Sequence, residues 1–98
     1  MSTYLVIYKP GPAWLPGRPL SEQPLKEHGR HMLKLYAQGS MKIAGPFGDD
    51  SGGAALIEAP DDNSARALID ADPGVTSGVF VAEMRSWALV AWENYLKK

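Results

Sequence analysis

The sequence predicts an α+β sandwich in which a four-stranded antiparallel sheet carries two helices on one face. Short apolar, β-branched runs alternate with segments of helical spacing, in the order strand, helix, strand, strand, helix, strand. Two split βαβ units in this order form a ferredoxin-like βαββαβ fold. A chain of 98 residues has room for one hydrophobic core, so we expect a single domain over residues 1–98.

The first half of the chain is predicted to hold a strand, an irregular loop and a helix. Residues 4–8 are aromatic and β-branched, which is typical of a buried strand. Four prolines and two glycines at positions 10–19 predict an irregular loop. Pro24 suits the first turn of a helix, and Gly39 suits its end. The predicted inner face of this helix contains Leu25, Met32, Leu35 and Tyr36.

The second half is predicted to hold three strands and one helix. The strands are expected at residues 41–44, 54–58 and 79–90, the last being the longest of the fold. Asp61 occupies an N-cap position, and Pro73 ends the second helix. The expected inner face of that helix consists of Ala65, Leu68 and Ile69.

Composition excludes several function classes. A net charge of −1 gives no electrostatic footprint for nucleic acid or anionic lipid, and the only basic cluster is the Lys97–Lys98 pair. The absence of cysteine excludes disulfides, thiolate catalysis and cysteine-ligated zinc. The apolar run at residues 4–8 is too short for a signal peptide or a membrane span, so a cytoplasmic protein is expected.

Alternation along residues 79–90 predicts an association surface. One face of this strand suits packing under helices, with Phe80, Ala82, Met84, Ala88 and Val90. The other face mixes apolar bulk and charge, with Val79, Val81, Glu83, Arg85, Trp87 and Leu89. An exposed apolar face of this kind usually marks association, so we expect a homodimer whose sheets face each other, with Glu83 paired to Arg85. The alternative is a solvated outer face with scattered apolar residues.

The two histidines of the chain, His28 and His31, differ in their predicted orientation. At about 100° per residue, His28 lies inside the apolar stripe, whereas His31 lies about 60° to one side, where it can reach water. Two histidines three residues apart do not form the metalloprotease pattern, and no third ligand follows, so no metal site is expected.

A buried imidazole requires a hydrogen-bond partner, and a carboxylate would orient the ring and raise its basicity. The candidates are Asp49, Asp50 and Asp72. Asp72 stands out because Pro73 fixes the chain beside it, between the helical layer and the last strand. Two interpretations remain open, since Asp72 also suits a cap for the turn that begins at Pro73.

Several segments together resemble the YCII-related (YciI-like) family. They are His28 with Gly39 eleven residues later, Ala-Gly-Pro-Phe at 44–47, the segment 65–75 with its Ala-Asp-Pro, Gly-Val-Phe at 78–80 and Arg-Ser-Trp at 85–87. The resemblance implies a dimeric α+β barrel in which His28 and Asp72 are the characteristic pair. The chain departs from the family's pattern at Gly74, where a large residue is usual, so we expect a pocket wall that is either open or differently filled.

The resulting hypothesis is a small enzyme without a cofactor, since no nicotinamide or flavin fingerprint is present. His28 would act as the general base and Asp72 would orient it, as lyase, isomerase or dehydrohalogenase chemistry requires. The small substrate, cyclic or aromatic, is expected to contact Gly45, Pro46, Phe47, Asp49 and Arg85. The alternative is a non-catalytic dimer that binds a small ligand or serves as a scaffold. A metal-dependent oxygenase of the same barrel class is a third interpretation.

Overall fold

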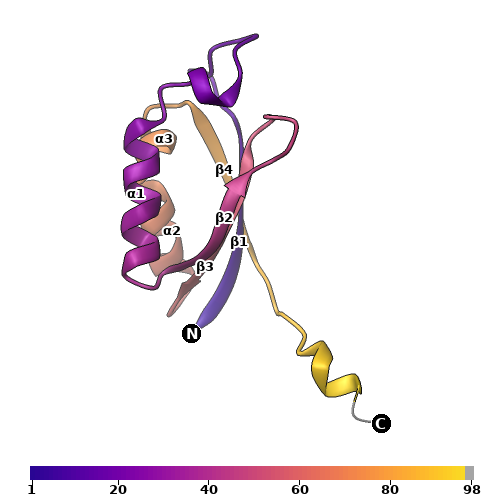
Figure 1. Ribbon diagram of the computed structural model, residues 1–98. Coiled ribbons are helices and arrows are strands. Elements are labelled where there is room, and N and C mark those ends of the chain that lie inside the picture. The colour runs from indigo at the N-terminus through magenta and orange to yellow at the C-terminus, as the bar shows by residue number, and fades with distance from the viewer. Residues whose placement is uncertain (97–98) are drawn as a thin grey trace.

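A computed structural model describes residues 1–96, so the Lys97–Lys98 pair lies outside the described residues. A four-stranded antiparallel sheet of order β2-β3-β1-β4 carries the helices on one face (Figure 1). This arrangement confirms the predicted ferredoxin-like βαββαβ fold. The elements are β1 (Ser2–Pro10), α1 (Lys26–Ala37), β2 (Met41–Pro46), β3 (Gly53–Ala59), α2 (Asp62–Asp70), α3 (Pro73–Thr76) and β4 (Phe80–Ser86), with 3₁₀ turns η1 (Leu20–Glu22) and η2 (Trp92–Leu96).

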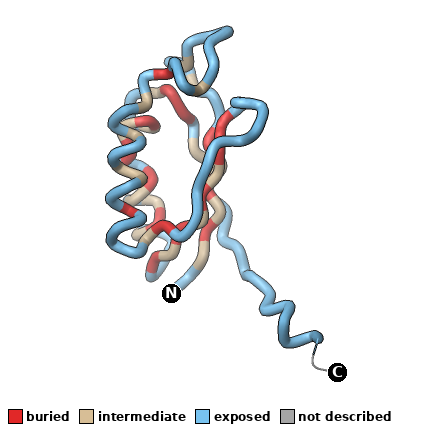
Figure 2. The backbone as a smooth tube through the Cα atoms, in the orientation of Figure 1, coloured by how far each residue is buried: buried red, intermediate tan, exposed pale blue. Residues whose placement is uncertain are grey.

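The two faces of the sheet differ in burial because side chains alternate along each strand. In β1, Tyr4, Val6 and Tyr8 are buried under the helices, whereas Leu5 and Ile7 on the opposite face are only partly buried. Buried residues accordingly follow the space between the sheet and the helices (Figure 2). Within residues 1–96, no helix covers the outer face of the sheet.

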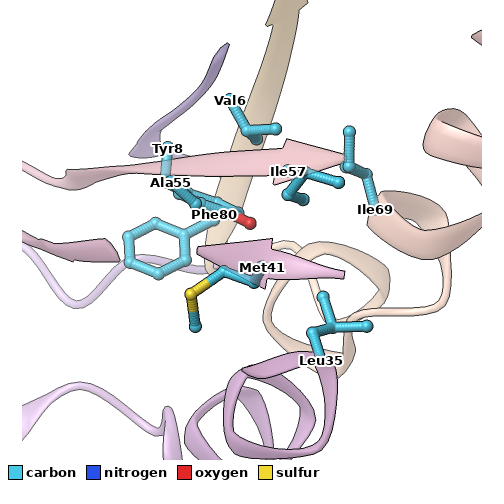
Figure 3. Close-up of a cluster of buried hydrophobic side chains, with 8 residues drawn as sticks. All are labelled: Val6, Tyr8, Leu35, Met41, Ala55, Ile57, Ile69 and Phe80. Carbon is cyan, nitrogen blue, oxygen red and sulfur yellow. The ribbon is translucent and has the colours of Figure 1, made fainter. Parts of the chain in front are cut away.

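The main core lies between the sheet and α1 and α2 (Figure 3). Its buried members come from every strand and from both long helices: Val6, Tyr8, Leu35, Met41, Ala55, Ile57, Ile69 and Phe80. Asp61 caps α2 as predicted, accepting a hydrogen bond of 2.8 Å from the Ser64 backbone N–H. The predicted inner face of α2 is confirmed, since Ala65 and Ile69 are buried and Leu68 packs against the core.

The prediction of a long last strand over residues 79–90 is wrong. Strand β4 ends at Ser86, and the longest strand is β1, with nine residues. The neighbouring β1 begins at Ser2, and the Trp87 N–H donates to the Thr3 carbonyl, so β4 has almost no partner beyond this point. Residues 87–96 therefore leave the sheet and extend away from the body (Figure 1).

The inner face of α1 is centred differently from the prediction. The side chains turned toward the sheet and α2 are His28, His31, Met32 and Leu35, at spacings of three and four residues. Tyr36, which was predicted to face inward, is 60% exposed. Leu25 precedes the helix as its N-cap residue, but it packs against the core as predicted. His28 consequently lies at the centre of this face.

Candidate functional site

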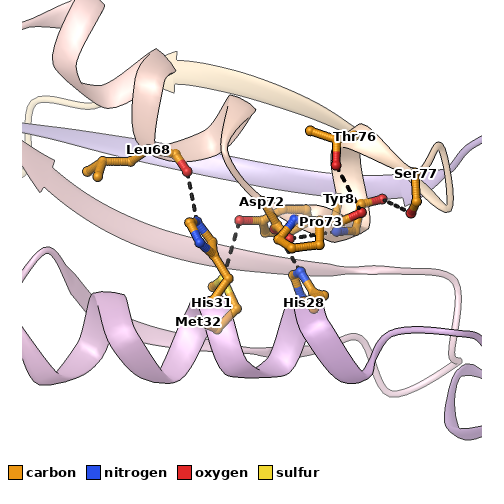
Figure 4. Close-up of polar contacts among 10 residues, drawn as sticks. Tyr8, His28, His31, Met32, Leu68, Asp72, Pro73, Thr76 and Ser77 are labelled. Carbon is orange, nitrogen blue, oxygen red and sulfur yellow. Dashed lines mark hydrogen bonds and ion pairs between the residues drawn. The ribbon is translucent and has the colours of Figure 1, made fainter.

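His28 and Asp72 are in direct contact across the interface of α1 with the segment that follows α2. The Nδ1 atom of His28 lies 2.7 Å from Oδ2 of Asp72 (Figure 4). The Asp72 residue is 0% exposed, and the His28 side chain is 17% exposed. Because a carboxylate oxygen accepts a hydrogen bond, Nδ1 carries a proton, and in the neutral ring Nε2 then presents its lone pair.

The second carboxylate oxygen of Asp72 caps α3. Oδ1 accepts a hydrogen bond of 2.8 Å from the backbone N–H of Gly74, and Pro73 occupies the first position of the helix. Asp72 is held in extended geometry, with φ −70° and ψ 120°, as expected of a residue before proline. Asp72 therefore has both of the roles that the sequence left open: Oδ2 contacts His28, and Oδ1 caps the turn that begins at Pro73.

Gly74 has a packing role beneath this pair, so the expected change in the pocket wall at this position is wrong. Gly74 is buried, and a Cβ atom placed on it would lie 3.0 Å from the His28 Cβ and 3.1 Å from its Nδ1. It is absent from the lining of the cavity beside His28. A glycine at this position allows the histidine ring to reach Asp72.

Two aromatic rings flank the imidazole. The centroids of Tyr8 and Phe80 lie 5.4 Å and 5.2 Å from that of His28, and both rings meet it edge-on. Burial raises the pKa of the Tyr8 phenol above its ordinary value, and the negative charge of Asp72 raises it further. Tyr8 therefore remains a neutral hydrogen-bond donor beside the histidine.

A cavity of about 620 Å³ lies beside His28, between α1, η1 and the ends of β2 and β3. This volume is within the range of small-molecule sites. Its walls are mainly apolar, with Leu20, Leu25, Met32, Met41 and Phe80. His28 and Tyr8 contribute polar groups, whereas Asp72 lies behind the histidine and does not line the cavity.

Two of the predicted substrate-binding residues lie on the cavity wall. Gly45 and Pro46 line it, although they belong to β2 and not to the following loop. Phe47 and Asp49 are not part of this wall. The Asp49 carboxylate instead interacts with Ser51, whose hydroxyl, and then whose backbone N–H at 3.0 Å, lower the pKa of Asp49. Arg85 lies on the opposite face of the sheet, paired with Glu83 at 3.1 Å, and cannot reach the cavity of its own chain.

His31 is more involved in the fold than expected. Its Nε2 atom lies 2.8 Å from the backbone carbonyl oxygen of Leu68, and the residue is partly buried (Figure 4). This contact ties α1 to α2, so His31 combines the partial exposure that the sequence predicted with a structural hydrogen bond that it did not. The two histidines thus differ in role, one packing helix on helix and the other lining the cavity.

Among the contributors to the cavity that sequence reasoning missed are Tyr8, Gln23 and the pair Gly52–Gly53. Tyr8 alternates with Tyr4 and Val6, so the strand pattern already placed a phenol on the inner face. The side-chain oxygen of Gln23 accepts a hydrogen bond of 2.7 Å from the Leu15 N–H, and its NH₂ group donates one of 2.9 Å to the Leu15 carbonyl. These two bonds fix the proline-rich loop beside the cavity. No local signal indicated this contact.

Residues 1–96 contain no group of three or more His, Asp or Glu side chains arranged to hold a metal ion. Over the same described range, no helix is long and apolar enough to cross a membrane.

The model of the YCII-related domain family matches residues 2–88, nearly the whole chain. The chain belongs to the YCII-related family. It is 37% identical over 62 residues to a Bacillus subtilis protein, "Uncharacterized protein YjpA", a match that covers 63% of this chain and 73% of that protein.

Two solved structures share the fold of this YCII-related chain. One is a 5-chloro-2-hydroxyhydroquinone dehydrochlorinase, TftG, from Burkholderia phenoliruptrix, in complex with 2,5-dihydroxybenzoquinone. Its TM-score is 0.61 at 19% sequence identity, and the match covers 89% of this chain and 95% of that one. The other is a muconolactone isomerase, with a TM-score of 0.69 and 11% identity, covering 91% of both chains. The fold is thus similar to that of dimeric α+β barrel proteins.

Proposed function

We propose that this YCII-related protein abstracts a proton from a small cyclic or aromatic substrate, using His28 as general base and no cofactor. The observation that carries the proposal is the 2.7 Å contact between His28 Nδ1 and a fully buried Asp72, on the wall of a cavity of about 620 Å³. A histidine that only stabilised the fold would not need to border a cavity large enough for a ligand.

The pair supports general base catalysis in the following way. Asp72 accepts a hydrogen bond from Nδ1–H and leaves the Nε2 lone pair to remove a proton from a carbon next to a carbonyl, or from a phenol. The C–H electron pair moves into the ring to form an enolate. The imidazolium, stabilised by Asp72, then returns the proton at another carbon in an isomerisation, or the enolate expels chloride in an elimination.

The cavity favours a flat and largely apolar substrate. Leucine, methionine and phenylalanine side chains form most of its wall. The glycines at positions 45, 52 and 53 also line it, and they add no side chains that would narrow it. The dehydrochlorinase of similar fold was crystallised with a dihydroxybenzoquinone, a ring of this kind. That likeness supports a ring substrate for this chain, on the basis of fold and cavity together.

Deuterium exchange tests the proposal directly. A panel of lactones, chlorinated hydroquinones and enolisable acids is incubated with the protein in D₂O, and deuterium incorporation is followed by NMR. We expect exchange into at least one compound, with a loss of at least about 100-fold in His28→Asn. His31→Asn is the matched control, because His31 contacts Leu68 and does not line the cavity.

The rival is a non-catalytic module in which the same cavity only binds a small ligand. It predicts saturable binding of a panel compound with no deuterium exchange above the uncatalysed rate. Equal exchange rates in the unchanged protein and in His28→Asn would therefore refute the catalytic proposal.

We also propose that the chain forms a homodimer through the outer face of its sheet. Three apolar side chains lie in a row across β1, β3 and β2, because Leu5 pairs with Leu56 and Leu56 pairs with Ile43. Ile43 is 69% exposed, and Val81 on β4 is 52% exposed. Glu83 lies between Lys9 at 2.9 Å and Arg85 at 3.1 Å, and these cations lower its pKa. An apolar centre with a charged margin is the usual composition of an interface.

Residues 87–96 extend this exposed apolar surface beyond the sheet. The large apolar side chains of this segment are between 45% and 85% exposed, namely Trp87, Leu89, Val90, Trp92, Tyr95 and Leu96. The partner that we propose for the outer sheet face and for residues 87–96 is a second copy of this chain. A second copy presents the same apolar sheet face and is present at the same concentration.

Sedimentation velocity tests the dimer with a matched pair of variants. Ile43→Glu places a charge in the apolar row formed by Leu5, Leu56 and Ile43 and is expected to give monomers. Leu33→Glu changes a leucine of nearly equal exposure, 68%, on the solvent side of α1, and is expected to leave the dimer intact. Monomeric unchanged protein at micromolar concentration would contradict this proposal.

A further inference from the structure

The Tyr8 hydroxyl has an unusually weak partner for a buried phenol. Tyr8 is only 4% exposed, and within residues 1–96 its hydroxyl makes one hydrogen bond, to Sδ of Met32 at 3.7 Å (Figure 4). A thioether sulfur is a weak acceptor. A buried donor in this state gains free energy when a stronger acceptor replaces the sulfur.

The position of this hydroxyl relates it to the proposed base. Tyr8, Met32 and His28 all line the same cavity, and the Tyr8 ring meets the His28 ring edge-on at 5.4 Å. Tyr8 comes from the centre of the sheet and His28 from α1, so the two groups border the cavity from different layers. A ligand bound in the cavity beside His28 is therefore also bordered by Tyr8.

We propose that Tyr8 donates a hydrogen bond to the substrate oxygen that becomes an enolate or phenolate when His28 removes the proton. This inference rests on the proposed function and names its substrate class: a planar ring with a carbonyl or hydroxyl oxygen next to the carbon that loses the proton. Enol-lactones and the keto forms of hydroxylated hydroquinones have this arrangement.

The proton balance of this step is simple. The substrate C–H proton passes to His28 Nε2, the electron pair of that bond forms a C=C bond, and the carbonyl electron pair moves onto the carbonyl oxygen. Tyr8 keeps its own proton while it donates a hydrogen bond to that oxygen. Burial and the nearby Asp72 charge raise the pKa of Tyr8, which keeps the phenol protonated for this purpose. The developing oxyanion is a stronger acceptor than sulfur, so the hydrogen bond strengthens as the charge forms.

Binding of 2,5-dihydroxybenzoquinone tests the assignment, because this ring presents both oxygen types to the cavity. Dissociation constants are measured by visible difference spectroscopy for the unchanged protein, Tyr8→Phe and the matched control Tyr36→Phe, whose ring is 60% exposed and outside the cavity. We expect Tyr8→Phe to weaken binding about 10- to 100-fold and Tyr36→Phe to leave it unchanged. Met32→Leu removes the competing sulfur and is expected to preserve or tighten binding.

The outcomes separate this inference from the proposed function. If Tyr8→Phe binds the quinone as tightly as the unchanged protein while His28→Asn loses binding and deuterium exchange, the Tyr8 assignment is wrong and the base remains. If the unchanged protein neither binds the quinone nor exchanges deuterium into any panel compound, both are overturned. Weaker binding and slower exchange in Tyr8→Phe, with circular dichroism unchanged, would support both.

Discussion

Gly74 leaves the space in which the imidazole of His28 lies, since a Cβ at residue 74 would come within 3.1 Å of Nδ1. The same glycine donates its N–H to Asp72, so one residue both admits the histidine and holds the carboxylate. The geometry of the pair therefore depends on a residue that touches no ligand.

Replacing Gly74 by alanine is expected to displace the histidine. The added methyl meets Cβ and Cγ of His28, atoms close to the helix backbone that move only with the helix. Overpacking of this kind costs about 1–3 kcal/mol, measured here by urea unfolding, and the deuterium exchange rate should fall. Gly48→Ala is the control, because no atom lies within 4 Å of the new methyl. Equal stability of the two variants would contradict this packing role.

Two substitutions of Asp72 should separate its two functions. Asparagine retains an oxygen for the Gly74 N–H, but its amide donates to His28 Nδ1, so the proton moves to Nε2 and the base is lost. We expect Asp72→Asn to remain folded, with exchange at least about 100-fold slower. Asp72→Ala also removes the cap and should cost about 1–3 kcal/mol more stability in urea unfolding. Wild-type exchange rates in Asp72→Asn would exclude the pair as the catalytic unit.

Gly29→Ala is expected to stabilise the protein and to weaken ligand binding at the same time. Gly29 lies within α1 on the cavity wall, and no atom approaches within 4 Å of an added methyl. The helix gains about 1 kcal/mol, which raises the melting temperature of a domain this size by about 4–8 °C. The methyl narrows the cavity, so 2,5-dihydroxybenzoquinone should bind less tightly. Unchanged affinity would show that the ligand does not use this wall.

Asp61 should contribute to the loss of stability in acid. Its hydrogen bonds with the Ser64 backbone N–H, and then with the Ser64 hydroxyl, hold its pKa below the ordinary carboxyl value. Because the folded pKa is the lower one, the stabilisation is present at neutral pH and is lost as pH falls through the carboxyl range. Asp61→Ser keeps a capping oxygen that does not titrate. The difference in free energy of unfolding between the unchanged protein and Asp61→Ser, measured by urea unfolding between about pH 7 and pH 3, should become smaller as the pH falls. A difference that does not change with pH would contradict this prediction.

Much of the fold was predictable because its signals are local. Alternation placed Tyr4, Val6 and Tyr8 on one face, and Asp61 marked the start of α2. The last strand was predicted too long because its pattern continues to Val90, whereas its length depends on where β1 begins. A pattern along one strand contains no information about the end of its neighbour.

The sequence by itself determined the order of elements, the inward orientation of His28 and the extended geometry of Asp72 before Pro73, because each follows from the chemistry of a few neighbouring residues. Only the tertiary structure decided that Asp72 divides its oxygens between His28 and Gly74, that Tyr8 borders the same cavity, and that Arg85 faces away from it. These relations join residues as far as 44 positions apart, as in His28 and Asp72, or concern opposite faces of one sheet. They are fixed by the packing of helices on the sheet and not by spacing along the chain.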